Sequence, residues 1–206
     1  MTVAAIRERD RKRSEVLTDE GLRFVLYKAE IRKYHLTEGA EIPEEDLREI
    51  QQVLLPKRAK LRAMNLLQSR DYTESRLREK LTEGGYPPEV VDEAVAYVAS
   101  YHYIDDGRYA ADFVRARMGR HSRARVRMDL LSKGIDPDTA DRALEEAYSD
   151  ELLAAEDPEI ALIRAAIRKK HFDPQTATWE EKQKFLAAMC RKGFSADKVR
   201  EAFSTT

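Results

Sequence analysis

Apolar residues recur along most of the chain with the spacing of amphipathic helices, and three segments repeat that pattern in register. Superposing Gly85, Gly134 and Gly193 aligns LREKLTEGGYPPEVVDEAV, VRMDLLSKGIDPDTADRAL and FLAAMCRKGFSADKVREAF. Apolar residues eight and four positions before the glycine form an i, i+4 pair, which predicts one buried helical face. The coinciding apolar sets are Leu77, Val126, Phe185; Leu81, Leu130, Met189; Tyr86, Ile135, Phe194; Val91, Ala140, Val199; Ala94, Ala143, Ala202; and Val95, Leu144, Phe203.

The shared glycine predicts a helix end in left-handed conformation, followed by an apolar residue that packs back on the last turn. Helix start signals lie on both sides of it. Upstream, we expect N-caps at Thr73 and Ser122, and a capping box of Thr178 with Glu181. The downstream signals are Pro87-Pro88, Asp136 before Pro137, and Ser195 before Asp197.

A further apolar-periodic helix precedes each pair, so each repeat is predicted to contain three helices. The expected apolar positions of that first helix are Ala63, Leu66, Leu67; Tyr109, Ala110, Phe113, Val114; and Ala161, Leu162, Ala165, Ala166. The glycines are 49 and then 59 residues apart, and we place the longer spacing in an acidic linker at 150–157 and a turn at 171–177. Stacked units of this size predict an elongated curved rod.

The segment 1–55 has a different pattern. Short apolar stretches at 3–7, 14–17 and 22–26, with Asp19-Glu20-Gly21 between the last two, predict a small β-meander with a hairpin. Helices are expected at 28–34 and at 44–54. The predicted fold is therefore mainly α: an N-terminal α/β extension at 1–55, then three-helix repeats at 57–104, 105–150 and 158–206.

Charge is neutral in total but not in distribution. The 206 residues carry 37 Lys and Arg against 38 Asp and Glu, a net charge of -1. Residues 57–80 hold eight bases and three acids, and residues 81–106 hold six acids and no Lys or Arg. Residues 107–135 hold eight bases and two acids, 136–159 ten acids and one Arg, and 161–192 eight bases and three acids. The first two helices of each repeat are therefore basic.

Two interpretations of these charge blocks stay open. Alternating blocks can simply neutralise each other between neighbouring helices and keep the surface soluble. Alternatively they form a basic ridge suited to a phosphate backbone or to an acidic groove on a polymeric partner. One base per repeat, Arg76, Arg125 and Lys184, stands nine positions before the glycine, where an exposed edge is expected.

Catalytic and metal-binding patterns are missing from the sequence. The four histidines, His35, His102, His121 and His171, have no metal-ligand spacing, and neither a GxxxxGK[ST] nor a GxGxxG motif occurs. We interpret Cys190 as a semi-buried structural thiol, because no recognisable catalytic signature surrounds it. The indole of Trp179 is expected to pack at a helix start, and Asp105 and Asp106 are expected to cap a helix. We therefore expect a protein that is not an enzyme and that has no cofactor or metal.

Several segments of the sequence resemble one known protein family. The segments RAMNLLQSRDYTESRLREKL, GYPPEVVDEAVAYVASYHYIDDGRYAADFVRAR and RVRMDLLSKGI resemble the RecX family, regulators of the RecA recombinase. YIDDGRYAADFVRAR is the most specific part, and YHLTEGAEIPEEDLREI resembles an extension found in one branch of the family. The resemblance covers nearly the whole chain, and the third repeat is its least similar part.

The resemblance implies a tandem of three-helix units that binds RecA nucleoprotein filaments and modulates, usually inhibits, their recombinase and coprotease activities in DNA repair and recombination. We expect the chain to lie in the filament groove as a cytoplasmic monomer, away from membranes and with weak DNA binding of its own. The alternative is an accessory DNA-binding protein that uses the same basic helices without RecA. The expected contacts are Arg76, Arg78, Lys80, Arg117, Arg123, Arg125, Arg127 and Lys133.

Overall fold

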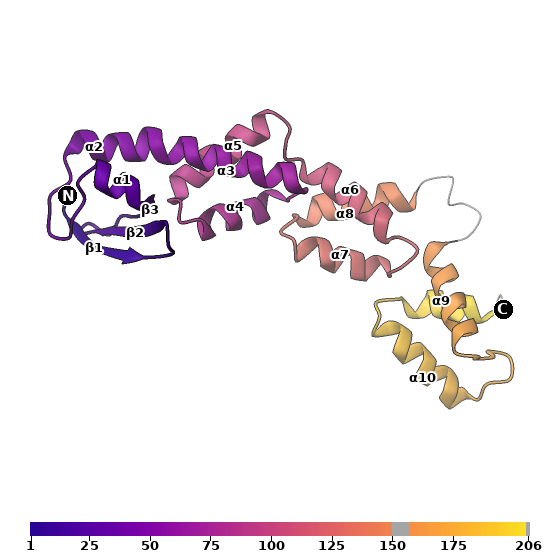
Figure 1. The fold of residues 1–206 in the computed structure, drawn as a ribbon. Coiled ribbons are helices and arrows are strands. Elements are labelled where there is room, and N and C mark those ends of the chain that lie inside the picture. Colours follow the sequence, from indigo (N-terminus) through magenta and orange to yellow (C-terminus); the bar gives the residue numbers. More distant parts are fainter. Residues whose placement is uncertain (150–156, 205–206) are drawn as a thin grey trace. The chain divides into compact units, whose positions relative to one another are not determined.

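The computed structural model describes residues 1–149 and 157–204, drawn as a ribbon in Figure 1. The chain divides into two compact units, Met1–Asp105 and Asp106–Thr206. Most of the linker expected at 150–157 lies outside the described residues. In the described part of the chain, no helix combines the length and apolar character needed to cross a membrane.

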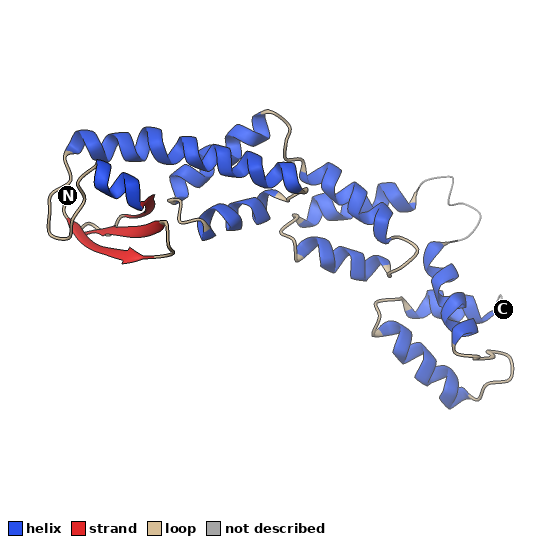
Figure 2. Ribbon diagram, in the orientation of Figure 1, coloured by secondary structure: helices blue, strands red, loops and turns tan. Residues whose placement is uncertain are grey.

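The first unit begins with the expected β-meander. Strands β1 (Val3–Glu8), β2 (Arg13–Thr18) and β3 (Arg23–Tyr27) form an antiparallel sheet in the order β1-β2-β3. Along β2 every second residue is buried, the pattern of a strand with one face on a core. Gly21, at a φ of 85°, allows the tight β2–β3 turn. The small sheet is visible in red in Figure 2.

A continuous helical run then leads from the sheet into the first three-helix domain. After α1 (Lys28–Lys33), α2 (Glu44–Glu49), the π-helical segment η1 (Ile50–Leu54) and α3 (Leu55–Ser69) follow one another without a break. Pro56 has no N–H to donate and would crowd a regular helical turn, so a wider turn directly before it relieves that conflict. No turn or loop separates 55 from 57.

Three-helix domains make up the rest of the chain, as the repeat predicted. Helix α3 is followed by α4 (Glu74–Glu83) and α5 (Pro88–Ser100). The second unit contains α6 (Asp106–Arg117), α7 (Arg123–Leu131) and α8 (Pro137–Tyr148), then α9 (Pro158–Lys169), α10 (Trp179–Cys190) and α11 (Ala196–Ser204).

The repeated glycine ends a helix as expected. Gly85, Gly134 and Gly193 have φ values of 86°, 81° and 89°. In each repeat the residue after the glycine donates its N–H to the carbonyl five positions back, for example Ile135 to Leu130 at 3.3 Å. That bond defines the Schellman motif, in which a left-handed residue closes the helix. Thr73, Ser122, Asp136 and Thr178 act as N-caps, as expected.

Nearly all the aligned apolar positions are buried. Leu77, Val126, Leu81 and Leu130 have no exposed surface, and Met189 is 2% exposed. Tyr86 and Phe203 are only partly buried. The repeat therefore identifies the cores of all three domains.

One expected core face is only partly correct. In α9 the buried positions are Ile160, Ile163 and Ile167. Leu162 and Ala166 are partly buried against them, whereas Ala165 is exposed. The isoleucines lie at i, i+3 and i+7 and bury more apolar area than the alanines beside them, so they determine which side faces inward.

Two side chains expected near the core are exposed. Cys190, at the last position of α10, is exposed and not semi-buried. The side chain of Trp179 is 74% exposed at the first position of the same helix. Residues in terminal turns lie beyond the packed centre of a short helix, which explains both differences.

Three histidines have a backbone role that their place in the sequence did not predict. His35, His102 and His171 have φ values of 49°, 56° and 51°, and each stands just after a helix, where the glycine stands in other helices. In each case the next residue donates its N–H five positions back, as Phe172 does to Ile167 at 3.1 Å. These histidines therefore close helices in Schellman geometry.

Candidate partner interface

The expected contact residues lie on α4, on α7 and on the ends of the neighbouring helices. In α4, Leu77 and Leu81 pack into the core, and in α7 Val126 and Leu130 do the same. The positions between them face outward because a helix turns by about 100° per residue. Arg76, Arg78 and Lys80 belong to the first unit, and Arg117, Arg123, Arg125, Arg127 and Lys133 to the second.

The base that recurs once per repeat is exposed in all three domains. Arg76, Arg125 and Lys184 are exposed, and the first two have 47% and 64% of their side-chain surface open to solvent. The residue after each of them is a core residue: Leu77, Val126 and Phe185. The sequence prediction that these bases sit on the exposed edge of a buried helical face is confirmed.

In α4 the three bases are interleaved with carboxylates. Arg76 pairs with Glu79 and Lys80 with Glu83, both at 2.6 Å. Arg78 donates to Glu74 at 2.8 Å and also pairs with Asp92 of α5. These hydrogen bonds, that to Glu74 first, raise the pKa of the Arg78 guanidinium above its ordinary value. The exposed side of α4 therefore carries both positive and negative side chains that pair with one another.

The second domain repeats this arrangement on α7. Arg127 makes two hydrogen bonds to Asp141 of α8, at 2.6 and 2.8 Å, and these lower the pKa of the Asp141 carboxyl. Arg125 pairs with Asp129 at 3.1 Å. Arg78–Asp92 and Arg127–Asp141 are equivalent ion pairs, because each joins the second helix of a repeat to the third, fourteen residues on.

The other three expected contacts lie against aromatic rings. The guanidinium of Arg117 lies 5.0 Å from the centre of the Phe113 ring, and the ammonium of Lys133 lies 5.3 Å from the same ring. Arg123 lies 5.5 Å from the ring centre of Tyr148. Each of these three cations is therefore attracted electrostatically to an aromatic ring face.

The second and third domains meet at two buried polar groups. The Ser122 hydroxyl donates to the carbonyl of Lys192 at 2.7 Å. Glu159, 5% exposed, accepts from the backbone N–H of Arg123 at 2.8 Å and from Lys198 at 2.7 Å. Lys198 also pairs with Asp157, the N-cap of α9. The third domain is thus joined to the N-terminal end of α7.

A second candidate site was not foreseen. A cavity of about 810 Å³ lies in the first unit, between the end of the sheet, α3 and the turn after α4. Arg13, Tyr27, Arg58, Arg62 and Tyr86 are among the residues that line it. These residues come from four separate segments, so no single motif marks them. The available signal was the row of Lys57, Arg58, Leu61 and Arg62 on one side of α3.

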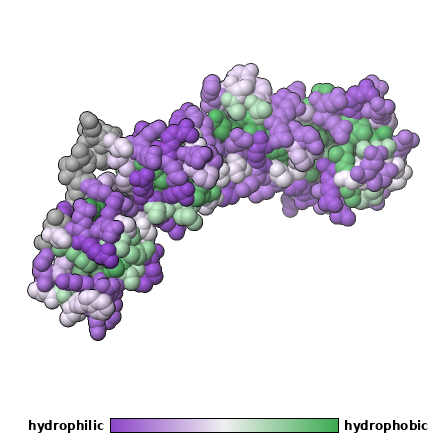
Figure 3. Space-filling model, turned by 180° about the vertical axis from the view of Figure 1, so that it is seen from behind, coloured by the Kyte–Doolittle hydropathy of each residue, from purple (hydrophilic) through white to green (hydrophobic). Residues whose placement is uncertain are grey.

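Groups suited to a metal ion do not occur in the described ranges 1–149 and 157–204: no three His, Cys, Asp or Glu side chains are clustered to hold one. His102 follows α5 and Asp106 begins α6. Hydrophilic residues cover most of the face drawn in Figure 3, with smaller hydrophobic patches between them.

Comparison with known proteins matches all three domains to one family. Residues 59–97, 105–144 and 157–203 match the models of the first, second and third three-helix domains of RecX. Regulatory protein RecX of Caldanaerobacter subterraneus subsp. tengcongensis is 30% identical over 172 residues, covering 83% of this chain and 82% of the relative. Regulatory protein RecX of Listeria monocytogenes is 24% identical and covers 98% of this chain and 74% of the relative.

Solved structures show the same fold. A crystal structure of a regulatory protein RecX has a TM-score of 0.64 and 24% identity, covering 100% of this chain and 99% of the other. The crystal structure of RecX from Lactobacillus salivarius has a TM-score of 0.61 and 20% identity over 73% of this chain and 96% of the other.

Proposed function

Because the chain belongs to the RecX family, we propose that it regulates a RecA recombinase by binding the RecA–DNA filament. Its relatives are named regulatory proteins. The chain lies in the groove of the filament and contacts more than one protomer. Bound there, it lowers recombinase, ATPase and coprotease activity because it obstructs DNA pairing or filament growth.

The observation that carries this proposal is the exposed base that recurs once per domain. A helical filament presents the same acidic and phosphate groups at a fixed interval. A binding chain built from repeats can meet them with the same residue from each repeat. Arg76 and Arg125 are the first of these contacts, and Arg78, Lys80, Arg117, Arg123, Arg127 and Lys133 complete the set.

The ion pairs on α4 and α7 favour such an exchange of partners. An exposed ion pair contributes only about 0–1 kcal/mol to stability. Arg76 and Arg125 can therefore leave Glu79 and Asp129 for a phosphate or carboxylate of the filament at little cost. The carboxylates left behind also repel bare DNA, which favours a mixed surface of protein and phosphate over DNA alone.

The test measures ATP hydrolysis by RecA on saturating single-stranded DNA, with this protein at substoichiometric ratios to RecA. We expect wild type to lower the rate, and the variant Arg76→Glu/Arg125→Glu to lose most of that effect while melting like wild type. Arg142→Glu is the matched control, because Arg142 is an exposed base on the acidic helix α8. An effect that needs enough protein to cover the DNA would contradict the proposal.

A second measurement separates RecA from DNA as the ligand. Affinity for single-stranded DNA is compared with and without RecA and a non-hydrolysable nucleotide, at low and physiological salt. Binding through phosphates alone falls steeply with salt, with a slope of about 0.7 per neutralised phosphate on single strands. We expect the filament complex to survive salt better. Equal affinities and equal slopes would replace the RecA regulator with an accessory DNA-binding protein.

A further inference from the structure

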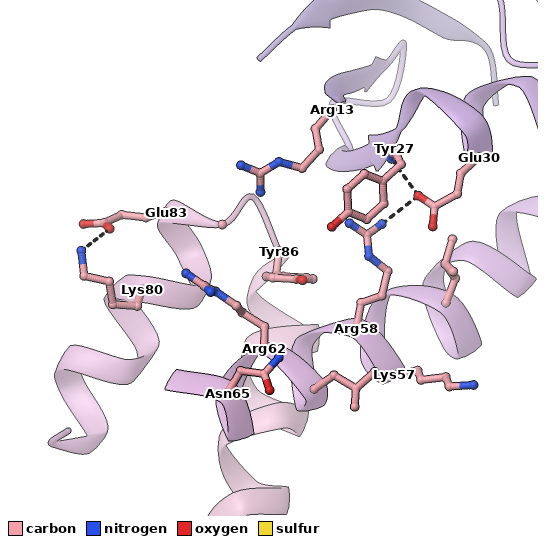
Figure 4. Close-up of a pocket in the computed structure, with 13 residues that line it drawn as sticks. Arg13, Tyr27, Glu30, Lys57, Arg58, Arg62, Asn65, Lys80, Glu83 and Tyr86 are labelled. Carbon is pink, nitrogen blue, oxygen red and sulfur yellow. Dashed lines mark hydrogen bonds and ion pairs between the residues drawn. The ribbon is translucent and has the colours of Figure 1, made fainter. Parts of the chain in front are cut away.

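The cavity in the first unit has walls from both the sheet module and the first three-helix domain. Arg13 lies on β2 and Tyr27 at the end of β3, Arg58 and Arg62 lie on α3, and Tyr86 follows the turn after α4. Figure 4 shows these side chains directed into a common space. Its volume of about 810 Å³ lies in the range of small-molecule sites.

The lining is strongly basic, and its acids are already occupied. Five bases line the cavity against two acids, Glu30 and Glu83. Glu30 accepts from Arg58 at 2.9 Å and from the backbone N–H of Tyr27 at 2.7 Å, and Glu83 pairs with Lys80 at 2.6 Å. Arg13 pairs with Asp10 at 2.7 Å, whereas among the described residues Arg62 forms no hydrogen bond or ion pair. The cavity therefore presents uncompensated positive charge.

The lining also offers aromatic and apolar surface. The Tyr27 ring is 42% exposed, and the Arg58 guanidinium lies 4.3 Å from its centre. Leu61, which also lines the cavity, is 48% exposed. Burial raises the pKa of the Tyr86 hydroxyl, so this group remains a protonated hydrogen-bond donor at neutral pH. A simple anion would not use these faces, whereas a planar base attached to a phosphate would.

The site is held in place before any ligand binds. Only 15% and 19% of the Arg58 and Glu30 side chains are exposed, so their ion pair is fixed by packing. Gly85 brings the turn after α4 so close to β3 that an added Cβ would clash with the Val25 side chain. Arg9 also donates a hydrogen bond to the carbonyl of Glu83. Preorganised side chains lose less entropy on binding.

We propose that this cavity binds a nucleotide unit, with its phosphate at Arg62 and Arg13 and its base against the Tyr27 ring. The unit can belong to a single-stranded nucleic acid or to a free nucleotide. Aromatic stacking combined with a few cations is the chemistry by which proteins hold single-stranded nucleic acids with little sequence preference. Of the residues proposed for RecA binding, only Lys80 lines this cavity, so the nucleotide site does not depend on that function.

The test uses the full chain without RecA, at low salt. A short fluorescein-labelled oligothymidylate is titrated by anisotropy, and ATP and thymidine monophosphate serve as competitors. We expect Arg62→Glu to weaken binding about tenfold or more, since it removes a charged contact. Tyr27→Leu should weaken it about fivefold or more through lost stacking. Arg23→Glu is the matched control, because Arg23 is an exposed base on the same sheet that does not line the cavity.

The outcomes separate the sources of the ligand. Oligonucleotide binding that free nucleotides do not displace identifies a nucleic-acid strand, and displacement by ATP identifies a free nucleotide. Binding that Arg62→Glu and Arg23→Glu weaken equally would overturn the site, as would a complete absence of binding. If polyglutamate binds more tightly than the oligonucleotide and Tyr27→Leu does not weaken its binding, the proposal of a nucleotide ligand is wrong and the ligand is an acidic peptide. Thermal melting confirms that each variant is folded.

Discussion

The Ser122 hydroxyl donates a hydrogen bond to the carbonyl of Lys192 at 2.7 Å, although the two residues are 70 positions apart. The same oxygen accepts the backbone N–H of Arg125 at 3.3 Å, as the N-cap of α7. The Ser122 hydroxyl therefore caps the N-terminus of α7 in the second domain and also donates a hydrogen bond to a carbonyl just after α10 in the third domain. Ser122 is only 1% exposed. Its hydroxyl can be buried without penalty because both of its hydrogen bonds are made within the protein.

Ser122→Ala should therefore cost more than the loss of an ordinary cap. We expect about 2 kcal/mol of unfolding free energy, from the lost N-cap and from the carbonyl left without its donor. Thr178→Ala is the comparison, because Thr178 caps α10 with local contacts only, and about 1 kcal/mol is expected there. Urea denaturation measures both. Equal losses would mean that the link to Lys192 contributes nothing.

Gly193→Ala should destabilise the protein more than Gly119→Ala does, because only the alanine at position 193 would meet a close neighbour. Both Gly193 and Gly119 have positive φ, 89° and 79°, so each substitution costs about 1–2 kcal/mol in the left-handed region. A Cβ at Gly193 would also lie 2.6 Å from the Ser122 oxygen, whereas at Gly119 nothing lies within 4 Å. We expect a further cost of about 1–3 kcal/mol at Gly193.

The Ser122→Ala background checks that explanation. Removing the hydroxyl oxygen removes the close contact, so Gly193→Ala should then cost about as much as Gly119→Ala. If the excess persists in that background, the contact with Ser122 is not its cause.

Core and surface substitutions on α4 and α7 should separate stability from activity. Leu81 and Leu130 have no exposed surface, so Leu→Ala at either should cost about 2–5 kcal/mol. Charge reversal at Arg76 and Arg125 should leave the melting temperature nearly unchanged and impair RecA regulation. Thermal melts beside the ATPase assay decide this. A double reversal that unfolds the protein while Leu130→Ala melts normally would reverse our assignment of faces.

The ion pairs of Lys198 with Asp157 and Glu159 should make the stability of the second unit depend on pH at both extremes. Burial alone lowers the pKa of Lys198, but hydrogen bonds to Asp157 and Glu159 outweigh it, so the pKa is raised above 10.5. Burial likewise raises the pKa of Asp157, but its hydrogen bonds to Lys198 and to the backbone leave it below 3.8. The first contribution is present below pH 10.5 and lost as pH rises through the raised pKa. The second is present above pH 3.8 and lost as pH falls through the lowered one.

We therefore expect the stability difference between wild type and Lys198→Met to be constant from about pH 5 to pH 9 and to shrink outside that range. Its plateau should be about 1–3 kcal/mol, because Glu159 is buried while Lys198 is partly exposed. Urea midpoints across the pH range measure it. Arg200→Met is the control, since Arg200 pairs with the exposed Asp197 of the same helix. A difference that stays constant at both extremes would contradict the coupling.

The fold was predictable because a glycine repeated three times fixes the register of every core position around it. Where two faces of one helix are both apolar, as in α9, that signal was insufficient. Alanines at 161, 165 and 166 satisfy the same period as Ile160, Ile163 and Ile167. Only the larger area buried by isoleucine decides between them.

The functional surfaces were predictable to different extents. Arg76 and Arg125 could be placed on an exposed edge because each precedes a core residue by one position. Their ion-pair partners in sequence, Glu79 and Asp129, follow from helical spacing. The cavity beside Tyr27 could not be found in this way. It depends on how the sheet packs against α3, and no local pattern encodes that contact.

The unbroken run of helix from α2 through η1 to α3 also determines how the first unit should come apart. Leu55, in that run, belongs to the same core cluster as Phe24 of the sheet and Leu81 of α4. A helix shared in this way transmits local opening in both directions, so the sheet and the first three-helix domain should form one cooperative unfolding unit. The period of a sequence repeat and the boundary of a folding unit are then different properties. Here the fold begins its first cooperative unit well before the first repeat begins.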